Sequence, residues 1–192
     1  MNLVGNSCVS SYINRDFLHV KYINPFCWCI MDFDSCYNLV KYWDKLDFNN
    51  FDLIKDDNWM FSIVIDGKVT VQYVHYIFDK NASNLIKNPP DVRWNRIWEY
   101  ICTKYIERIQ KIKSEPPIFL FATANNGLSR HKPFTLEQQK KLANLDTEYK
   151  IICSFSNNIH DERLVSIDQD KKFNDNGIEF AKYIFEHIRG II

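Results

Sequence analysis

The sequence has few glycines and no excess of charge of either sign. Its 192 residues include only five Gly and six Pro, which excludes collagen-like repeats and glycine-rich low-complexity chains. Lys plus Arg and Asp plus Glu each total 24, so the formal net charge is zero. A chain without a global positive field does not attract nucleic acid over its whole surface. We therefore expect no nucleic-acid partner.

Long apolar runs are also missing. No stretch approaches the about 20 apolar residues that a membrane-spanning helix needs. The first residues lack the basic, apolar and small-residue segments of a secretory leader. The sequence therefore predicts no transmembrane segment and a cytoplasmic location, with the inner face of the membrane as the alternative place of action.

The cysteines do not follow the spacing of a metal site. Cys27, Cys29 and Cys36 form a CxC pair with a distant third thiol, whereas a structural zinc site needs four ligands, usually in CxxC-type pairs. We therefore predict no metal site, and the sequence leaves open which cofactor, if any, the protein uses. A chain of this size folds without disulfides, so we expect reduced thiols throughout. The six cysteines stand at positions 8, 27, 29, 36, 102 and 153.

Apolar and aromatic residues are plentiful. Hydrophobic residues make up 46% of the sequence and aromatic residues 15%. This content is ample for one sizeable core and argues against disorder. We expect one domain that covers residues 1–192.

Short apolar runs alternate with longer helical patterns along the chain. Residues 1–5 (MNLVG), 117–123 (PIFLFAT) and 149–155 (YKIICSF) read as buried strands, and we expect them to be adjacent and central. Helical spacing of apolar residues over 93–113 and 176–190 predicts two of the helices between and after them. The pattern favours a layered α/β fold with a mostly parallel sheet and helices on both faces.

One antiparallel hairpin is expected beside the parallel strands. Asp66-Gly67 separates the β-rich stretches 59–65 and 69–78, and an Asp-Gly pair favours a tight turn between two strands.

The stretch LVGNSC, residues 3–8, is the first candidate for a functional site. Gly5 permits a sharp turn from strand to helix, and ligands of parallel sheets bind beyond the carboxyl ends of the strands. Cys8 then falls in the first helical turn, where the helix dipole lowers a thiol pKa and favours a nucleophile. Asn6 is a candidate donor to an oxyanion. The alternative is a small cysteine that only packs the helix against the sheet.

His75 is the candidate base for this thiol. It stands in VQYVHY among apolar neighbours near the end of a predicted strand, and a nucleophilic cysteine needs a base. The competing interpretation is a core histidine bound to a backbone carbonyl.

Basic residues on the long predicted helix are candidates for substrate binding. Arg96 and Arg108 are the two residues that we expect to hold an anionic substrate group. The alternative is a solvated helix face without a ligand.

The order of several short segments resembles a bacterial family catalogued as domain of unknown function 1919 and described as exopolysaccharide-biosynthesis-like. The segments are NSC, YINPF, DFDSCYNLV, VQYVHY, YIERIQKI and EYKIICSF, and the similarity covers residues 3–155. The sequence departs from the family pattern at Val9 and Ser10, where the family has a small, glycine-containing pair, and at Tyr105, where it favours tryptophan. A fainter similarity links the chain to papain-like cysteine peptidases.

The resemblance implies work on surface polysaccharide and supports Cys8 and His75 as site residues, with Tyr76 beside them as a substrate contact. Three hypotheses follow. The first is a cysteine-dependent transferase that acts on a sugar or sugar nucleotide, by acyl or related group transfer. The second is a non-catalytic polysaccharide-binding or assembly protein, in which Trp28, Trp94 and Trp98 stack on sugar faces. The third is a papain-like cysteine hydrolase. The sequence indicates no oligomeric state.

Overall fold

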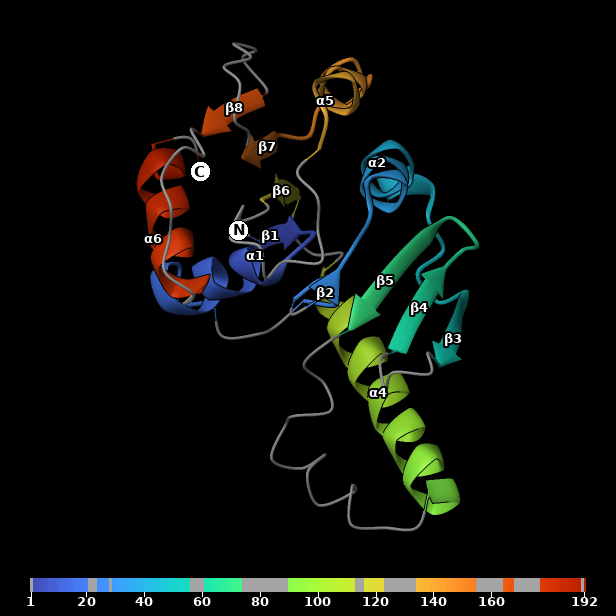
Figure 1. Cartoon of the computed structure of the whole chain (residues 1–192). Coiled ribbons are helices and arrows are strands. Elements are labelled where there is room, and N and C mark those ends of the chain that lie inside the picture. The colour runs from blue at the N-terminus through green and yellow to red at the C-terminus, as the bar shows by residue number, and fades with distance from the viewer. Residues whose placement is uncertain are drawn as a thin grey trace.

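The computed structural model combines helices with two β-sheets, one parallel and one antiparallel (Figure 1). The prediction of a mixed α/β fold is therefore confirmed. The structure describes residues 2–20, 24–27, 29–55, 61–73, 90–112, 116–122, 134–154, 164–167, 177–190 and 192. Among these residues, no helix has both the length and the apolar character needed to cross a bilayer.

The parallel sheet has the strand order β1-β6-β7-β8. Its strands are β1 (Asn2–Gly5), β6 (Pro117–Phe121), β7 (Ile151–Ser154) and β8 (Leu164–Ile167). All three pairings are parallel. The predicted adjacency of β1, β6 and β7 is confirmed, but β1 lies at the edge of this sheet and not at its centre.

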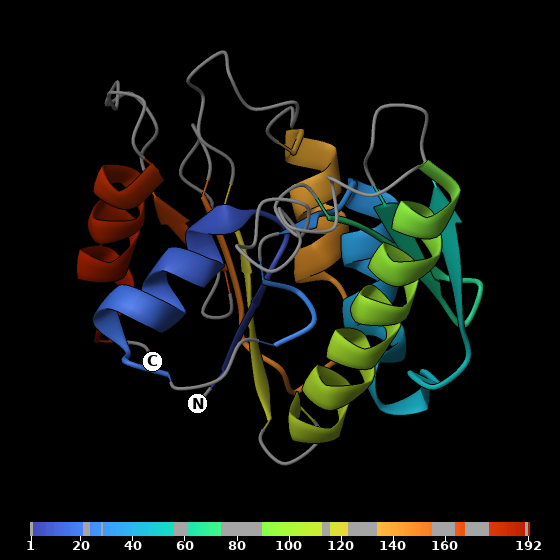
Figure 2. The same cartoon turned by 90° about the horizontal axis from the view of Figure 1, so that it is seen from below.

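One face of the parallel sheet packs against the first and last helices. These are α1 (Cys8–Tyr12), which continues as a π-helical segment over Ile13–Phe17, and α6 (Gly177–Ile188). Leu3, Leu120 and Ile152 share an apolar cluster with residues of α6 such as Phe180 and Ile184. Figure 2 shows α1 and α6 together on one side of the parallel strands.

The other side chains of these strands join a second, larger apolar cluster. Val4, Phe119 and Ile151 pack there with buried residues of the remaining helices and of the antiparallel sheet. These helices are α2 (Phe33–Tyr42), followed by a 3-10 turn over Trp43–Lys45, α4 (Pro90–Ile112) and α5 (Leu136–Ala143). The strands β1, β6 and β7 therefore bury apolar side chains in both directions, as their apolar runs predict.

The antiparallel sheet has the strand order β2-β5-β4-β3. Its strands are β2 (Cys29–Ile30), β5 (Val69–Tyr73), β4 (Phe61–Ile65) and β3 (Phe51–Lys55). The predicted hairpin of β4 and β5 is confirmed, and two further strands extend it. The β3 strand is absent from the sequence prediction because its five residues, FDLIK, do not keep the alternation of apolar and polar side chains and include Asp and Lys, which are depleted in strands.

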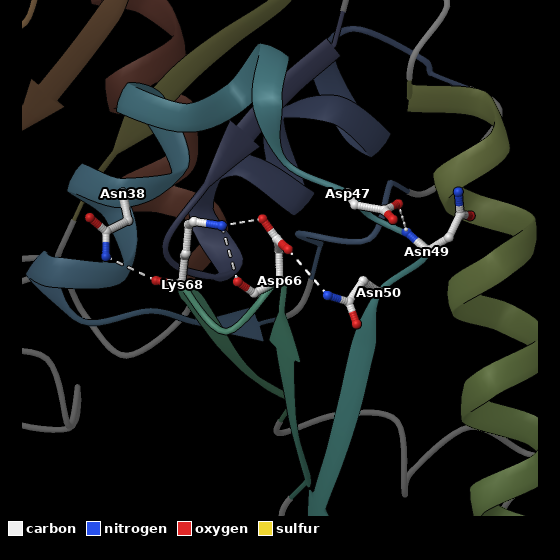
Figure 3. A network of polar contacts seen from close by, with 6 residues as sticks. All are labelled: Asn38, Asp47, Asn49, Asn50, Asp66 and Lys68. Atoms are coloured by element: carbon white, nitrogen blue, oxygen red, sulfur yellow. Dashed lines mark hydrogen bonds and ion pairs between the residues drawn. The ribbon is translucent and has the colours of Figure 1, made fainter.

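The turn of this hairpin has the backbone that Asp-Gly predicts. Asp66 and Gly67 have φ angles of 50° and 62°, and the Lys68 N–H donates to the Ile65 carbonyl at 2.9 Å. Figure 3 shows the side chains around it: Lys68 pairs with the Asp66 carboxylate, and Asn50 Nδ2 donates to Asp66 Oδ1 at 3.2 Å. The turn is thus fixed both by its backbone and by local polar contacts.

Within the described residues, the outer edge of β1 is lined by side chains and not by another strand. Asn14 Oδ1 accepts from the Leu3 N–H at 3.2 Å, and Asn14 Nδ2 donates to the Leu3 carbonyl at 2.9 Å. Asn24 Nδ2 donates to the same carbonyl at 2.9 Å, and the Cys29 thiol lies 3.6 Å from the Gly5 carbonyl oxygen. Asn14, Asn24 and the first residue of β2, Cys29, therefore close this edge.

Candidate functional site

The carboxyl end of β1 is where the sequence places the candidate site, and Ser7 organises it. The Ser7 Oγ donates to the Ala122 carbonyl at 2.7 Å, which joins the ends of β1 and β6. The same oxygen accepts from the Val9 N–H at 3.4 Å and caps α1. Ser10 Oγ donates to the Ser7 carbonyl at 3.1 Å. These contacts fix the turn from strand to helix.

Gly5 makes this turn possible because nothing larger fits. A Cβ at this position would lie 2.4 Å from Ser10 Oγ and 2.8 Å from the Leu120 carbonyl oxygen. Cβ atoms essentially never make non-bonded contacts this short, so the close approach of α1 to β6 requires glycine. The sequence prediction of a glycine-dependent turn is consistent with this packing.

Asn6 follows with a fully buried side chain, 0% exposed. The backbone carbonyl of Asn6 accepts from the Met31 N–H at 3.3 Å. Within the residues that the structure describes, neither Oδ1 nor Nδ2 of its carboxamide has a hydrogen-bond partner. A buried, unsatisfied polar group costs about 1–3 kcal/mol of stability. The carboxamide can therefore offer one donor and one acceptor to a bound molecule.

Cys8 lies half-buried in the first turn of α1, as its sequence position predicts. Its predicted low pKa is wrong: burial raises the pKa of Cys8 to about 11, and the neighbouring Cys27 adds to the increase. Removal of water from the thiolate outweighs the backbone hydrogen bonding that favours it. At pH 7 the resting side chain is a protonated thiol.

Two further thiols lie beside Cys8, namely Cys27 and Cys29. Cys27 Sγ lies 4.0 Å from Asn14 Nδ2, and the Cys29 thiol donates to the Phe26 carbonyl at 3.0 Å. Burial raises the pKa of both thiols. All six cysteines fall in the described part of the chain and are free, and no group of His, Cys, Asp or Glu in that part could hold a metal ion.

Arg108 approaches these thiols from α4. It shares a helix face with Ile101, Tyr105 and Ile112, each of which is at most 2% exposed. Its charge lowers the pKa of Cys27 and of Tyr73, although burial raises both overall. Burial also lowers the pKa of Arg108 itself, but a guanidinium keeps its proton in proteins. The positive charge of Arg108 therefore acts on Cys27, one of the thiols beside Cys8.

Arg96 is not brought to the same place. Its side chain is exposed, and it precedes Arg108 by twelve residues on α4, a separation of about 18 Å along the axis at 1.5 Å per residue. Of the two arginines expected to hold a substrate, only Arg108 lies beside the candidate site.

His75 and Tyr76 lie outside the described residues, as do Trp28 and the side chain of Trp94. The described part of β5 ends at Tyr73, which pairs with Cys29 across the sheet. The Tyr73 hydroxyl donates to the Pro25 carbonyl. The predicted pairing of Cys8 with His75 stays a prediction.

Sequence reasoning missed Cys27 and Cys29 as neighbours of Cys8, and Tyr73 as a neighbour of those two cysteines. The two cysteines had a signal, their CxC spacing, but this spacing was weighed only for metal binding. Tyr73 gave none, because a tyrosine on an alternating strand is typical of any half-buried sheet.

Comparison with protein-family models, with curated proteins and with solved structures finds no match to this chain. The family is therefore not shown by comparison, and any function has to rest on the residues of the site.

Proposed function

We propose that this chain is an enzyme that binds a polar small molecule at the carboxyl end of β1 and transfers a group through Cys8. The observation that carries the proposal is the Asn6 carboxamide, which is fully buried and, within the described residues, has no partner for either polar atom. A buried polar group without a partner is rare in native proteins and calls for an explanation, and a role in binding or catalysis is one of those known. Asn6 stands two residues before the half-buried Cys8.

The proposed step is acyl or related group transfer. A base takes the Cys8 proton as Sγ attacks the carbonyl carbon of the donor, and the carbonyl oxygen becomes an oxyanion that Asn6 Nδ2 stabilises. The leaving group departs with a proton, and a thioester remains on Cys8. An acceptor hydroxyl then attacks the thioester carbon, so that an ester C–O bond forms and the C–S bond breaks. The base passes the hydroxyl proton to the Cys8 sulfur and restores the thiol. The high pKa of Cys8 means that the base is essential, and His75 is the candidate from the sequence.

The proposed substrate is a sugar or sugar nucleotide of a capsule or exopolysaccharide. This part rests on the sequence resemblance alone. The layered arrangement, with helices on both faces of the parallel sheet, is part of the same proposal and is supported by the two apolar clusters. A cytoplasmic location and action at the inner face of the membrane stay predictions.

A second candidate is a non-catalytic polysaccharide-binding or assembly protein. It is favoured by the raised pKa of Cys8, because a thiol that titrates at about 11 is almost entirely protonated at pH 7. In this case Asn6 binds the ligand, and Cys8 packs α1 against the sheet without reacting. Alkylation of Cys8 by iodoacetamide should then rise about tenfold per pH unit from pH 7 to 10, with or without ligand.

Intact-mass spectrometry separates the two candidates. The protein is incubated with acyl-coenzyme A and acyl-phosphate donors, and a covalent adduct is sought on Cys8. The enzyme proposal expects an adduct in the wild type and in the matched Cys102→Ser control, but none in Cys8→Ser. If no donor labels Cys8 while free sugars still raise the melting temperature, the binding protein replaces the enzyme.

Asn6→Leu tests the observation that carries the proposal. Leucine has a similar shape and no polar atoms, so removal of an unsatisfied carboxamide should leave the free energy of unfolding unchanged or raise it. The same change should abolish both the Cys8 adduct and sugar binding. Clear destabilisation by Asn6→Leu would show that the carboxamide is a structural group and would contradict the proposal.

A further inference from the structure

A second buried carboxamide lies on the same side of the parallel sheet as the larger apolar cluster. Gln139 of α5 is 3% exposed. Its Nε2 donates to the Phe134 carbonyl at 2.9 Å, whereas its Oε1 has no hydrogen-bond partner in the part of the chain that the structure describes. Gln139 shares a helix face with Leu142 and Ala143, which both pack in that cluster. The helix therefore turns Gln139 toward this face of the sheet.

The Asn6 side chain is directed to the same face by the alternation of β1. Val4 packs in the larger cluster, whereas a Cβ on Gly5 would meet Ser10 of α1, which covers the opposite face. Successive side chains of a strand alternate between its faces, so Asn6 follows Val4. Met31, another member of the larger cluster, donates its N–H to the Asn6 backbone carbonyl at 3.3 Å. Asn6 and the carboxamide of α5 thus belong to one face of the sheet.

Two phenyl rings connect these carboxamides. The parallel register of β1 and β6, continued by one residue, makes Asn6 and Phe121 neighbours across the sheet. The Phe121 ring contacts the Phe134 ring, with centroids 6.1 Å apart. Phe134 is the residue whose carbonyl Gln139 binds. Asn6 and Gln139 therefore flank a pair of aromatic rings at the carboxyl end of β6.

We propose that this site takes an uncharged sugar ring, whose hydroxyl groups bond to the carboxamides of Asn6 and Gln139 while one C–H face packs on Phe121 and Phe134. This inference rests on the proposed function, because it names the part of the substrate that the site holds. Carboxamides offer donors and acceptors without charge, and phenyl rings offer an apolar surface. A sugar ring presents both kinds of surface, with hydroxyls at its rim and C–H groups on its faces. The four side chains are at most 8% exposed, so the sugar binds by displacing groups that cover them.

The test is the binding of the methyl glycosides of glucose, galactose and mannose, measured by isothermal titration calorimetry and by the shift in melting temperature. At least one glycoside should bind the wild type and the matched control Gln110→Met, which changes an exposed glutamine of α4. Gln139→Met keeps an unbranched side chain and should weaken binding about fivefold, as expected for one lost hydrogen bond between uncharged groups. Failure of all three glycosides to bind the wild type overturns the inference.

A second variant covers the case in which Gln139→Met does not fold. Phe134→Leu keeps an apolar side chain and the backbone carbonyl that Gln139 binds, but it removes the flat ring. It should weaken binding of the same glycoside several-fold. Equal binding by the wild type and either variant overturns the inference. Equal loss in Gln110→Met and Gln139→Met also overturns it, because the loss then does not depend on the buried position.

The inference and the proposed function can fail separately. If no glycoside binds while a donor still labels Cys8, the sugar contact is wrong and the transferase stands. If Asn6→Leu abolishes glycoside binding while Gln139→Met leaves it unchanged, the site stands and the role of Gln139 is wrong. If binding needs both carboxamides while Cys8 remains unlabelled by every donor, the inference holds in a sugar-binding protein without covalent chemistry.

Discussion

The two sheets of this protein bury their side chains differently. In β6 of the parallel sheet, the consecutive residues Phe119, Leu120 and Phe121 are all at most 1% exposed. In β4 of the antiparallel sheet, buried residues alternate with half-buried ones, so that Ile63 is inaccessible while Val64 is not. A strand covered on both faces tolerates no polar side chain, whereas a strand covered on one face tolerates them at every second position.

This difference decides where polar groups can gather. The strands of the parallel sheet carry almost none, so its polar groups lie past the strand ends, as Asn6 and Ser7 do. The antiparallel sheet distributes its polar groups along the exposed face and at the Asp66-Gly67 turn. The candidate site therefore lies at the end of the sheet whose strands are most apolar, as is general for parallel sheets.

The largest expected effects come from alanine substitutions at two neighbouring residues in each sheet. In β6, Phe119→Ala should destabilise the protein by about 3–5 kcal/mol and Leu120→Ala by about 2–5 kcal/mol, because both leave cavities in packed clusters. Phe119 contacts the Trp43 ring with centroids 5.3 Å apart. Ile63→Ala should cost a similar amount, but Val64→Ala less than about 1 kcal/mol. Urea unfolding measures all four.

The difference between the two sheets would be contradicted by a small loss of stability in Leu120→Ala or by a large loss in Val64→Ala. The first result would mean that α1 and α6 do not cover their face of the sheet in solution. The second would mean that the outer face of β4 is covered by another part of the chain or by another copy.

Much of this architecture follows from local sequence patterns. The apolar runs of β6 and β7 and the Asp-Gly turn are short-range signals, and the structure confirms each. The four-stranded extent of the antiparallel sheet was missed, because β3 has a weak pattern and β2 has two residues only. The edge position of β1 was also missed, since the side chains that close it come from other parts of the chain, Asn14 from the π-helical segment and Asn24 from the loop before β2.

The next effect concerns that closed edge. Asn14→Leu removes both hydrogen bonds to Leu3 and leaves the buried Leu3 N–H without its 3.2 Å partner. The expected loss is about 2–3 kcal/mol in urea unfolding. The matched control is Asn38→Leu beside the antiparallel sheet, where an exposed bond to the Lys68 carbonyl at 2.9 Å is lost. That change should cost less than about 1 kcal/mol, because water replaces the bond.

The candidate site was predictable in its position but not in its chemistry. LVGNSC places Gly5, Asn6 and Cys8 at the end of a strand, and the structure has them there. The pKa of Cys8 could not be predicted, because it depends on burial by residues such as Cys27, which the chain brings close only when folded. Arg96 and Arg108 were equal candidates in the sequence. Only the fold shows that Arg96 is exposed while Arg108 acts on Cys27.

A smaller effect is expected at the turn between β1 and α1. Gly5→Ala places a Cβ 2.5 Å from Ser10 Cβ and 2.8 Å from the Leu120 carbonyl oxygen. Neither the helix nor the strand can move without loss of packing, so we expect a loss of about 1–3 kcal/mol. Gly190→Ala is the control, since a Cβ there meets nothing within 4 Å. Equal stability of the two variants would show that α1 is not held tightly against β6.

The smallest effect belongs to the hairpin turn, where the reason for glycine is different. A Cβ on Gly67 meets nothing within 4 Å, but the φ angle of 62° is one that alanine adopts at a cost of about 1 kcal/mol. Gly67→Ala should lower the free energy of unfolding by that amount in urea titration. Gly67→Asn should cost less, because asparagine tolerates the left-handed region. Rescue by asparagine would establish that the backbone angle, and not space, requires glycine in the antiparallel sheet. Equal losses in the two variants would instead mean that the turn needs the absence of a side chain, as Gly5 does beside the parallel sheet.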